Sequence, residues 1–133
     1  MKRLVVDLRP GDYAMARLPA SSLPAATGLF ELAGSAMVSL TRTPDEISVV
    51  CPTEFVPAAE QVDSGWRLLT VRGPLEFTLT GIMAALSGAL AAAGVSLFAL
   101  STFDTDHVLV KAADLSRAID ALTEAGHEVH QPT

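Results

Sequence analysis

The chain has little of what several common protein classes require. It contains a single cysteine, Cys51, among 133 residues, which excludes a disulfide framework or a multi-cysteine zinc site within one chain. Lys and Arg number 9 against 15 Asp and Glu, for a net charge of −6, and the basic residues are scattered. Because phosphate binding needs a clustered basic face, no nucleic-acid partner is expected.

Aromatic residues are also scarce, at 5% of the chain, yet half of the residues are hydrophobic and 18% are charged. This composition is typical of a folded chain, either one compact domain or two small halves that share a core. The N-terminal sequence MKRLVVDLRPGD reaches Asp7 and Arg9 after a short apolar stretch. That pattern is unlike a signal peptide, so we expect a cytoplasmic protein.

Residues 77–103 carry no charged side chain, a length that could cross a bilayer. The hydrophobic period changes within this run, however. Ile82, Leu86 and Leu90 follow a helical i, i+4 stripe, whereas VSLFALS after Gly94 is typical of a buried strand. A glycine at that point is a common helix end. We therefore expect a core helix followed by a strand, and no membrane span.

Two segments of the chain are similar to each other. LTRTPDEISVV, starting at Leu40, aligns without gaps to LSTFDTDHVLV, starting at Leu100, and both are typical of a β-hairpin. A strand candidate precedes each hairpin, at 13–18 and 66–71. The first half carries prolines in its connection, which allow at most one short helix near its end. We predict two halves, residues 1–60 and 61–133.

The second half continues into another helix and strand. Asp114 is a plausible N-cap, Leu115, Ile119 and Leu122 form an apolar stripe, and Gly126 ends the helix before a strand at 127–130. The order strand, helix, strand, strand, helix, strand predicts a four-stranded antiparallel sheet with both helices on one face. The predicted class is α+β, a ferredoxin-like βαββαβ fold, with the first half a degenerate copy.

The segments GPLEFTLTGI and STFDTDHVLV resemble the ACT domain family of amino-acid-binding regulatory modules. They are similar to the last ACT repeat of the cytosolic arginine sensors, to small two-ACT bacterial proteins and to aspartate kinase regulatory domains. The resemblance implies a free amino acid bound where two ACT units pack side by side. The matching positions are Gly73, Glu76, Leu79, Thr80, Thr102, Phe103, Thr105 and Asp106.

Elementary chemistry supports this assignment. A helix that starts near Thr78 or Thr80 has no Glu placed to close a capping box, so its free N–H groups, around Leu79, Thr80, Gly81 and Ile82, can receive an α-carboxylate. Glu76 and Asp106 can receive an ammonium or guanidinium group, and Phe103 can cover an apolar stem. The alternative is structural: Glu76 and Asp106 as solvated turn acids, Phe103 as a core residue.

No catalytic constellation accompanies these residues. His127 and His130 are three apart on a strand and therefore point to opposite faces, which argues against a shared metal ion. His107 lies beside Asp106 without a Ser or Cys partner visible in the sequence, and phosphate-binding glycine motifs are absent. We expect no enzyme activity, no cofactor and no metal.

Two functions remain open. The first is an amino-acid-binding sensor module that acts as a ligand-responsive homodimer, because an isolated ferredoxin-like half leaves a sheet edge to cover. The alternative is a structural dimerisation domain that keeps the same scaffold without a ligand.

Overall fold

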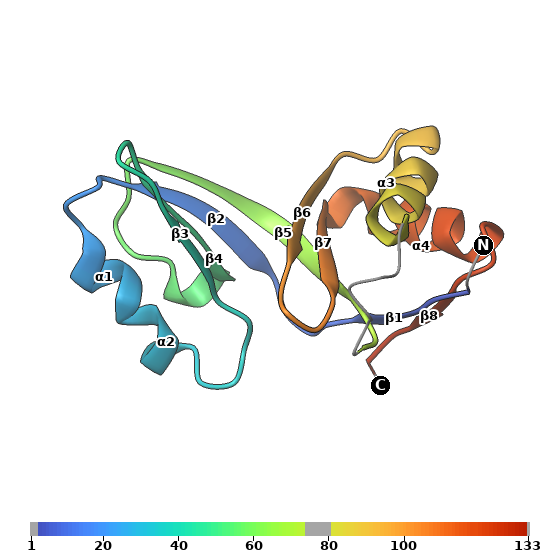
Figure 1. Cartoon of the computed structure of the whole chain (residues 1–133), viewed down its shortest axis with the longest axis horizontal. Coiled ribbons are helices and arrows are strands. Elements are labelled where there is room, and N and C mark those ends of the chain that lie inside the picture. The colour runs from blue at the N-terminus through green and yellow to red at the C-terminus, as the bar shows by residue number, and fades with distance from the viewer. Residues whose placement is uncertain (1–2, 74–80, 133) are drawn as a thin grey trace. The chain divides into compact units, whose positions relative to one another are not determined.

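The computed structural model describes residues 3–73 and 81–132, and the chain divides into two compact units (Figure 1). The N-terminal unit is residues 11–65, and the C-terminal unit is residues 1–10 with 66–133. Both combine strands with helices, so the α+β class is confirmed. The division differs from the predicted 1–60 and 61–133 chiefly because the first ten residues join the C-terminal unit.

The N-terminal unit is a sheet in the order β3-β4-β2-β5, to which β5 contributes its first residues. The side chains of Ala16, Leu18, Ile47 and Val49 form its core together with Cys51, where burial raises the pKa of the thiol. Its elements are β2 (Tyr13–Leu18), α1 (Leu23–Thr27), α2 (Leu29–Leu32), β3 (Ser39–Arg42), β4 (Ile47–Pro52), a 3-10 turn (Thr53–Phe55) and β5 (Gln61–Val71).

Two short helices, α1 and α2, connect β2 to β3, so the expectation of at most one short helix near the end was wrong. The first begins early because Pro24 occupies its first turn, where the missing N–H is not needed for a helical hydrogen bond. Gly28 separates the two helices, and Ala26 and Leu29 pack into the core.

The C-terminal unit contains the predicted order of elements from β5 onward. Its helices cover one face of the sheet, where Leu86, Leu90, Ala118 and Leu122 pack against strand residues such as Val108 (Figure 1). The elements after β5 are α3 (Ile82–Ala92), β6 (Leu97–Ser101), β7 (Asp106–Lys111), a 3-10 turn (Ala112–Asp114), α4 (Leu115–Glu124) and β8 (Glu128–His130). Among the described residues, no helix combines the length and apolar character that a membrane crossing requires.

The sheet of this unit is not the predicted four-stranded one. Strand β1 (Val5–Leu8) lies between β5 and β8, antiparallel to the first and parallel to the second, so the described order is β6-β7-β5-β1-β8. Val6 pairs with Val71 on one side and with Val129 on the other. The insertion is favourable because Val6 and Leu8 bury apolar side chains in the core beneath the helices.

Glycines end both helices of this unit, as the sequence predicted. Gly94 has a φ of +73° and Gly126 a φ of +98°, a left-handed conformation that glycine adopts without steric cost. Beyond each glycine the chain turns back, and the N–H of His127 donates to the carbonyl of Leu122 at 3.0 Å. Each glycine therefore determines where the helix ends and the chain turns toward the following strand.

Asp114 occupies the N-cap position of α4, as predicted, but its side chain does not cap the helix. Its carboxylate instead pairs with the guanidinium of Arg117 at 2.5 Å. The cap is thus replaced by an ion pair across the first turn.

The two similar hairpins are present, but the predicted alignment between them is shifted by one residue. Arg42 pairs with Ile47 at the end of the first hairpin, and Ser101 pairs with Asp106 at the end of the second. In each turn the first N–H donates to the last carbonyl at 2.9 Å. Asp106 therefore corresponds to Ile47, not to the acidic residue before it, and a one-residue slip exchanges the faces of a strand.

Candidate functional site

The predicted site lies where the β6–β7 turn meets the end of β5. Strand β7 pairs with β5, with His107 opposite Thr70, so the turn that precedes His107 reaches the last residues of β5. The hydroxyl of Thr105 donates to the carbonyl oxygen of Val71 at 2.6 Å. Thr105 and Gly73, two of the predicted residues, therefore come from segments that the structure brings together.

Residues 74–80 lie outside the described part of the chain, and the predicted Glu76, Leu79 and Thr80 fall among them. The helix that follows begins at Ile82, later than the expected start near Thr78 or Thr80. Gly81 is its N-cap residue, with a φ of +80°, and a glycine has no side chain that could cap the helix. Within the described residues, no side-chain cap is therefore present at the first turn of α3, which includes the N–H of Ile82.

The turn itself is held by hydrogen bonds between its own threonines. The N–H of Thr102 donates to the carbonyl of Thr105 at 2.9 Å, and the hydroxyl of Thr102 accepts from the N–H of Thr105 at 3.4 Å. These hydrogen bonds lie within the turn and hold its backbone in place. Phe103 lies at its tip, with 79% of its surface exposed, so its alternative assignment as a core residue was wrong.

Asp106 begins β7 directly after the turn. The hydroxyl of Ser101 donates to its Oδ1 at 2.5 Å, which orients the carboxylate across the ladder between β6 and β7. Asp106 is half-buried, so the carboxylate is both positioned by the protein and accessible. A carboxylate has about four acceptor sites, so the hydrogen bond to Ser101 leaves capacity for a cationic ligand group.

His107, the next residue, is buried, with 9% of its surface exposed. Its Nδ1 lies 2.9 Å from the hydroxyl of Thr70, and burial lowers the pKa of the ring, against the opposing charge of Asp106. The ring is therefore neutral at pH 7 and supports the strand beside Asp106. Sequence reasoning did not identify this role, although the alternation along β7 could have indicated it.

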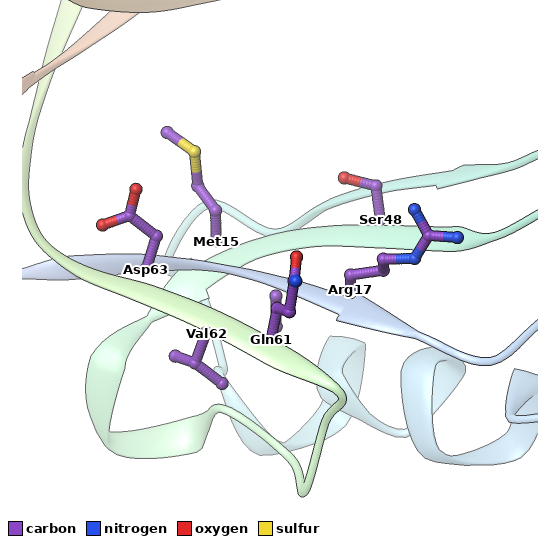
Figure 2. Close-up of a pocket in the computed structure, with 7 residues that line it drawn as sticks. Met15, Arg17, Ser48, Gln61, Val62 and Asp63 are labelled. Carbon is purple, nitrogen blue, oxygen red and sulfur yellow. The ribbon is translucent and has the colours of Figure 1, made fainter.

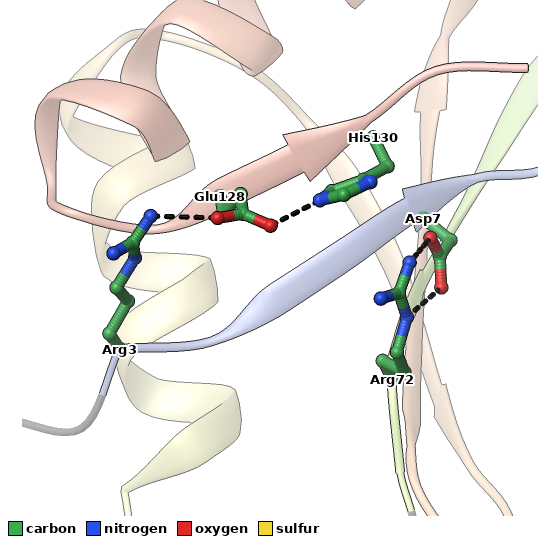
Figure 3. Close-up of polar contacts among 5 residues, drawn as sticks. All are labelled: Arg3, Asp7, Arg72, Glu128 and His130. Atoms are coloured by element: carbon green, nitrogen blue, oxygen red, sulfur yellow. Dashed lines mark hydrogen bonds and ion pairs between the residues drawn. The ribbon is translucent and has the colours of Figure 1, made fainter.

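His127 and His130 lie apart and serve different contacts. His127 is buried, and its Nδ1 accepts the N–H of Leu4 at 3.1 Å, while burial lowers its pKa. His130 is exposed and bonds to the carboxylate of Glu128, which also pairs with Arg3 at 2.8 Å (Figure 3). Within residues 3–73 and 81–132, no group of His, Cys, Asp or Glu side chains is arranged to hold a metal ion.

A second polar pair joins the inserted strand to the end of β5. The guanidinium of Arg72 donates to Asp7 through two bonds of 2.6 and 3.0 Å (Figure 3), and this lowers the pKa of the Asp7 carboxyl. Arg72 precedes Gly73, where the predicted ligand loop begins. The pair therefore fixes the chain directly before Gly73.

A pocket in the N-terminal unit was not predicted from the sequence. It has a volume of about 480 Å³ and is lined by side chains of β2, β4 and the start of β5 (Figure 2). Alternation along β2 puts the side chains of Met15 and Arg17 on the lining face, while Ala16 and Leu18 pack into the core. The lining residues are Met15, Ala16, Arg17, Ser48, Gln61, Val62 and Asp63.

Solved structures resemble this chain over most or all of its length. A protein from Agobacterium tumefaciens is 38% identical, with a TM-score of 0.86, and the match covers 100% of this chain and 96% of that one. The ligand-free regulatory subunit of aspartate kinase from Thermus thermophilus has a TM-score of 0.65 at 12% identity, covering 91% of this chain and 96% of that one. The second likeness, at that identity, shows a shared fold alone.

Sequence comparisons assign the two parts of the chain to different models. The cytosolic arginine sensor for mTORC1 subunit 1 from Rattus norvegicus is 45% identical over 58 residues. This match covers 43% of this chain but only 18% of the sensor's length. A model of an N-terminal domain matches residues 11–59, and the ACT domain model matches residues 61–124. Residues 61–124 therefore belong to the ACT domain family.

Proposed function

We propose that this chain is an amino-acid-binding regulatory module that acts as a ligand-responsive homodimer. The observation that supports it most is the convergence of the β6–β7 turn on the end of β5, fixed by the bond from Thr105 to the Val71 carbonyl at 2.6 Å. Both segments belong to the part that matches the ACT domain model. The arginine sensor, which is 45% identical to this chain over 58 residues, is named for sensing an amino acid, which favours the same ligand class here.

In the proposed complex each end of a zwitterion meets an opposite charge. The α-carboxylate accepts hydrogen bonds from backbone N–H groups around residues 79–82, at the start of α3. The ammonium or basic side chain binds Asp106, whose orientation Ser101 sets, or Glu76. Phe103 covers the apolar stem. Charge-assisted hydrogen bonds of this kind contribute about 1.5–3 kcal/mol each.

The proposed dimer forms through β6. Among the described strands β6 pairs with β7 alone, and it carries Leu97, Phe98, Ala99 and Leu100 without a charged side chain. Phe98 is 37% exposed. An apolar strand edge of this kind is prone to pair with another chain. Pairing with β6 of a second copy satisfies its backbone groups and produces two equivalent sites.

A thermal-stability screen with each of the twenty amino acids tests the ligand. A ligand at one hundred times its Kd adds about 2.7 kcal/mol to the free energy of unfolding, which is visible as a raised midpoint. We expect one amino acid, or one chemical group of them, to stand out. A dimer in sedimentation velocity with no amino acid raising the midpoint would instead support the structural dimerisation domain, and a monomer with the ligand present would contradict the proposed dimer.

A further inference from the structure

We infer that the N-terminal unit carries a second, separate binding site, for an uncharged small molecule with an aromatic ring and a hydrogen-bonding group. The site is the pocket of about 480 Å³ on the sheet face formed by β2, β4 and the start of β5 (Figure 2). Pockets that hold small ligands span roughly 300–1,000 Å³, so this volume suits a small ring compound. The pocket does not share a residue with the site proposed at the β6–β7 turn.

The pocket brings four side chains of different chemistry to the same face of the sheet. Met15 and Arg17 alternate with core residues along β2, and Ser48 of β4 is the cross-strand partner of Arg17. Figure 2 shows Met15 and Gln61 projecting from this face, and β2 and β5 are neighbouring strands. A ligand on this face therefore meets a thioether, a guanidinium, an amide and a hydroxyl group.

The charges around Arg17 disfavour a charged ligand of either sign. Glu46 lies 3.7 Å from its Nη1 and Glu60 3.8 Å from its Nε, and neither belongs to the described residues that line the pocket. An anion at the guanidinium would also meet these two carboxylates, whereas a cation would meet the guanidinium itself. Asp63 lines the pocket too, but it has an interaction of its own, and the ligand class does not depend on it. An uncharged ligand avoids both repulsions.

The remaining groups suit an aromatic ring that carries a hydrogen-bonding group. A guanidinium is planar and weakly hydrated, and it stacks on aromatic faces. The Arg17 side chain is 45% exposed, so a ligand can reach it. The thioether of Met15 makes a favourable contact with an aromatic ring. The hydroxyl of Ser48 and the amide of Gln61 can each donate and accept a hydrogen bond, which suits an amide or hydroxyl group on the ring.

NMR spectra of the methionine methyl groups detect a ring in this pocket directly. The full chain, labelled at these methyl groups and assigned with M15L, is titrated with benzamide, an uncharged aromatic amide. The ring current of a bound aromatic ring changes the resonance of a nearby methyl group, so we expect a saturable shift of the Met15 signal. Cyclohexanecarboxamide carries the same amide on a saturated ring and should bind about tenfold more weakly. Met83 of α3 reports on the C-terminal unit and should not respond.

A matched pair of variants and two charged probes test the ligand class. Arg17→Lys keeps the charge but removes the planar group, so it should weaken benzamide binding about tenfold. Arg42→Lys, an exposed change in the same unit, should leave it unchanged. Benzoate and benzylamine, which add a negative and a positive charge to the same ring, should both bind more weakly than benzamide.

Several results would overturn the inference. An unshifted Met15 signal at millimolar benzamide would show that the pocket does not bind an aromatic ring, even if Met83 responds to an amino acid. Equal binding of benzamide and cyclohexanecarboxamide, or equal binding by Arg17→Lys and the unchanged chain, would show that stacking contributes nothing. Tighter binding of benzoate or of benzylamine would show that the pocket selects a charge instead.

Discussion

The buried histidines of the C-terminal unit make its stability depend on pH. The pKa of His127 is lowered from 6.5 because burial disfavours the charged ring, and its Nδ1 already accepts the N–H of Leu4. A base whose pKa is lower in the folded state stabilises the fold fully above its unfolded pKa, and this contribution is lost as the pH falls. His107 shifts in the same direction.

We therefore predict that the free energy of unfolding falls as the pH drops below 6.5, the ordinary histidine value. The carboxylates of Asp7 and Glu128, whose pKa values are lowered from 3.8 and 4.5, add a further loss only below those values. Urea denaturation at a series of pH values measures the slope, and NMR titration follows the His127 ring. A His127 ring that titrates at or above 6.5 would contradict the prediction.

Thr105 is predicted to be a stabilising residue of the turn as well as part of the site. Thr105→Val keeps the shape of the side chain but removes the hydroxyl that donates to the Val71 carbonyl at 2.6 Å. The loss should be about 0.5–1.5 kcal/mol of unfolding free energy, measured by chemical denaturation. Thr41→Val, an exposed change in β3, is the control and should have almost no effect. Equal stability of both variants would show that the bond does not hold the turn.

Among the helices and strands, the features predicted correctly from the sequence are those that local residue patterns determine. Gly94 and Gly126 marked the ends of α3 and α4 because both need a left-handed backbone there. The insertion of β1 could not be predicted in this way, since the pairing of Val6 with Val71 joins residues distant in sequence. The sequence alignment of the two hairpins was wrong by one residue for a related reason. Similar alternating strands can be aligned at two offsets, and only the hydrogen bonds of the two turns, at Thr102 and at the matching position of the first hairpin, show which offset is correct.

Helix α3 offers a pair of glycines with opposite expected effects. Gly81 has a φ of +80°, so Gly81→Ala forces a side chain into a left-handed conformation and should destabilise the protein by about 1–2 kcal/mol. Gly88 lies within the helix, and a Cβ built there meets no atom within 4 Å. Gly88→Ala should therefore stabilise the protein by about 0.5–1 kcal/mol. Thermal denaturation compares the two variants, and a stabilising Gly81→Ala would contradict the assigned helix start.

For the whole molecule, we predict that two copies assemble through the edge strand β6. Phe98→Lys puts a charge on the apolar strand β6 and should convert the dimer to a monomer, because a charge on an edge strand disfavours pairing. Thr41→Lys, on the edge strand β3 of the other unit, should leave the dimer intact. Sedimentation velocity measures both. If Phe98→Lys sediments as the unchanged protein does, the copies associate elsewhere.

The candidate site was predictable only in part. The turn residues Thr102, Thr105 and Asp106 lie together because a hairpin keeps its ends adjacent, and their role in binding stays a prediction. The hydrogen bond from Ser101 to Asp106 joins two strands and depends on their register. The sequence alignment had that register wrong by one residue, so this contact could not be predicted from it. The pocket beside Arg17 required the pairing of β2 with β4, which the sequence does not specify locally.

The most direct measurement is a calorimetric titration of the amino acid that the thermal screen identifies. Three proteins are compared: the unchanged chain, Asp106→Asn, and Asp104→Asn, which alters an exposed acid in the same turn. The account predicts that Asp106→Asn binds about tenfold to a hundredfold more weakly, as the loss of one charge-assisted bond implies, at nearly unchanged thermal stability. Asp104→Asn should bind like the unchanged chain. Equal affinity in all three proteins would contradict the assignment of Asp106 to the site.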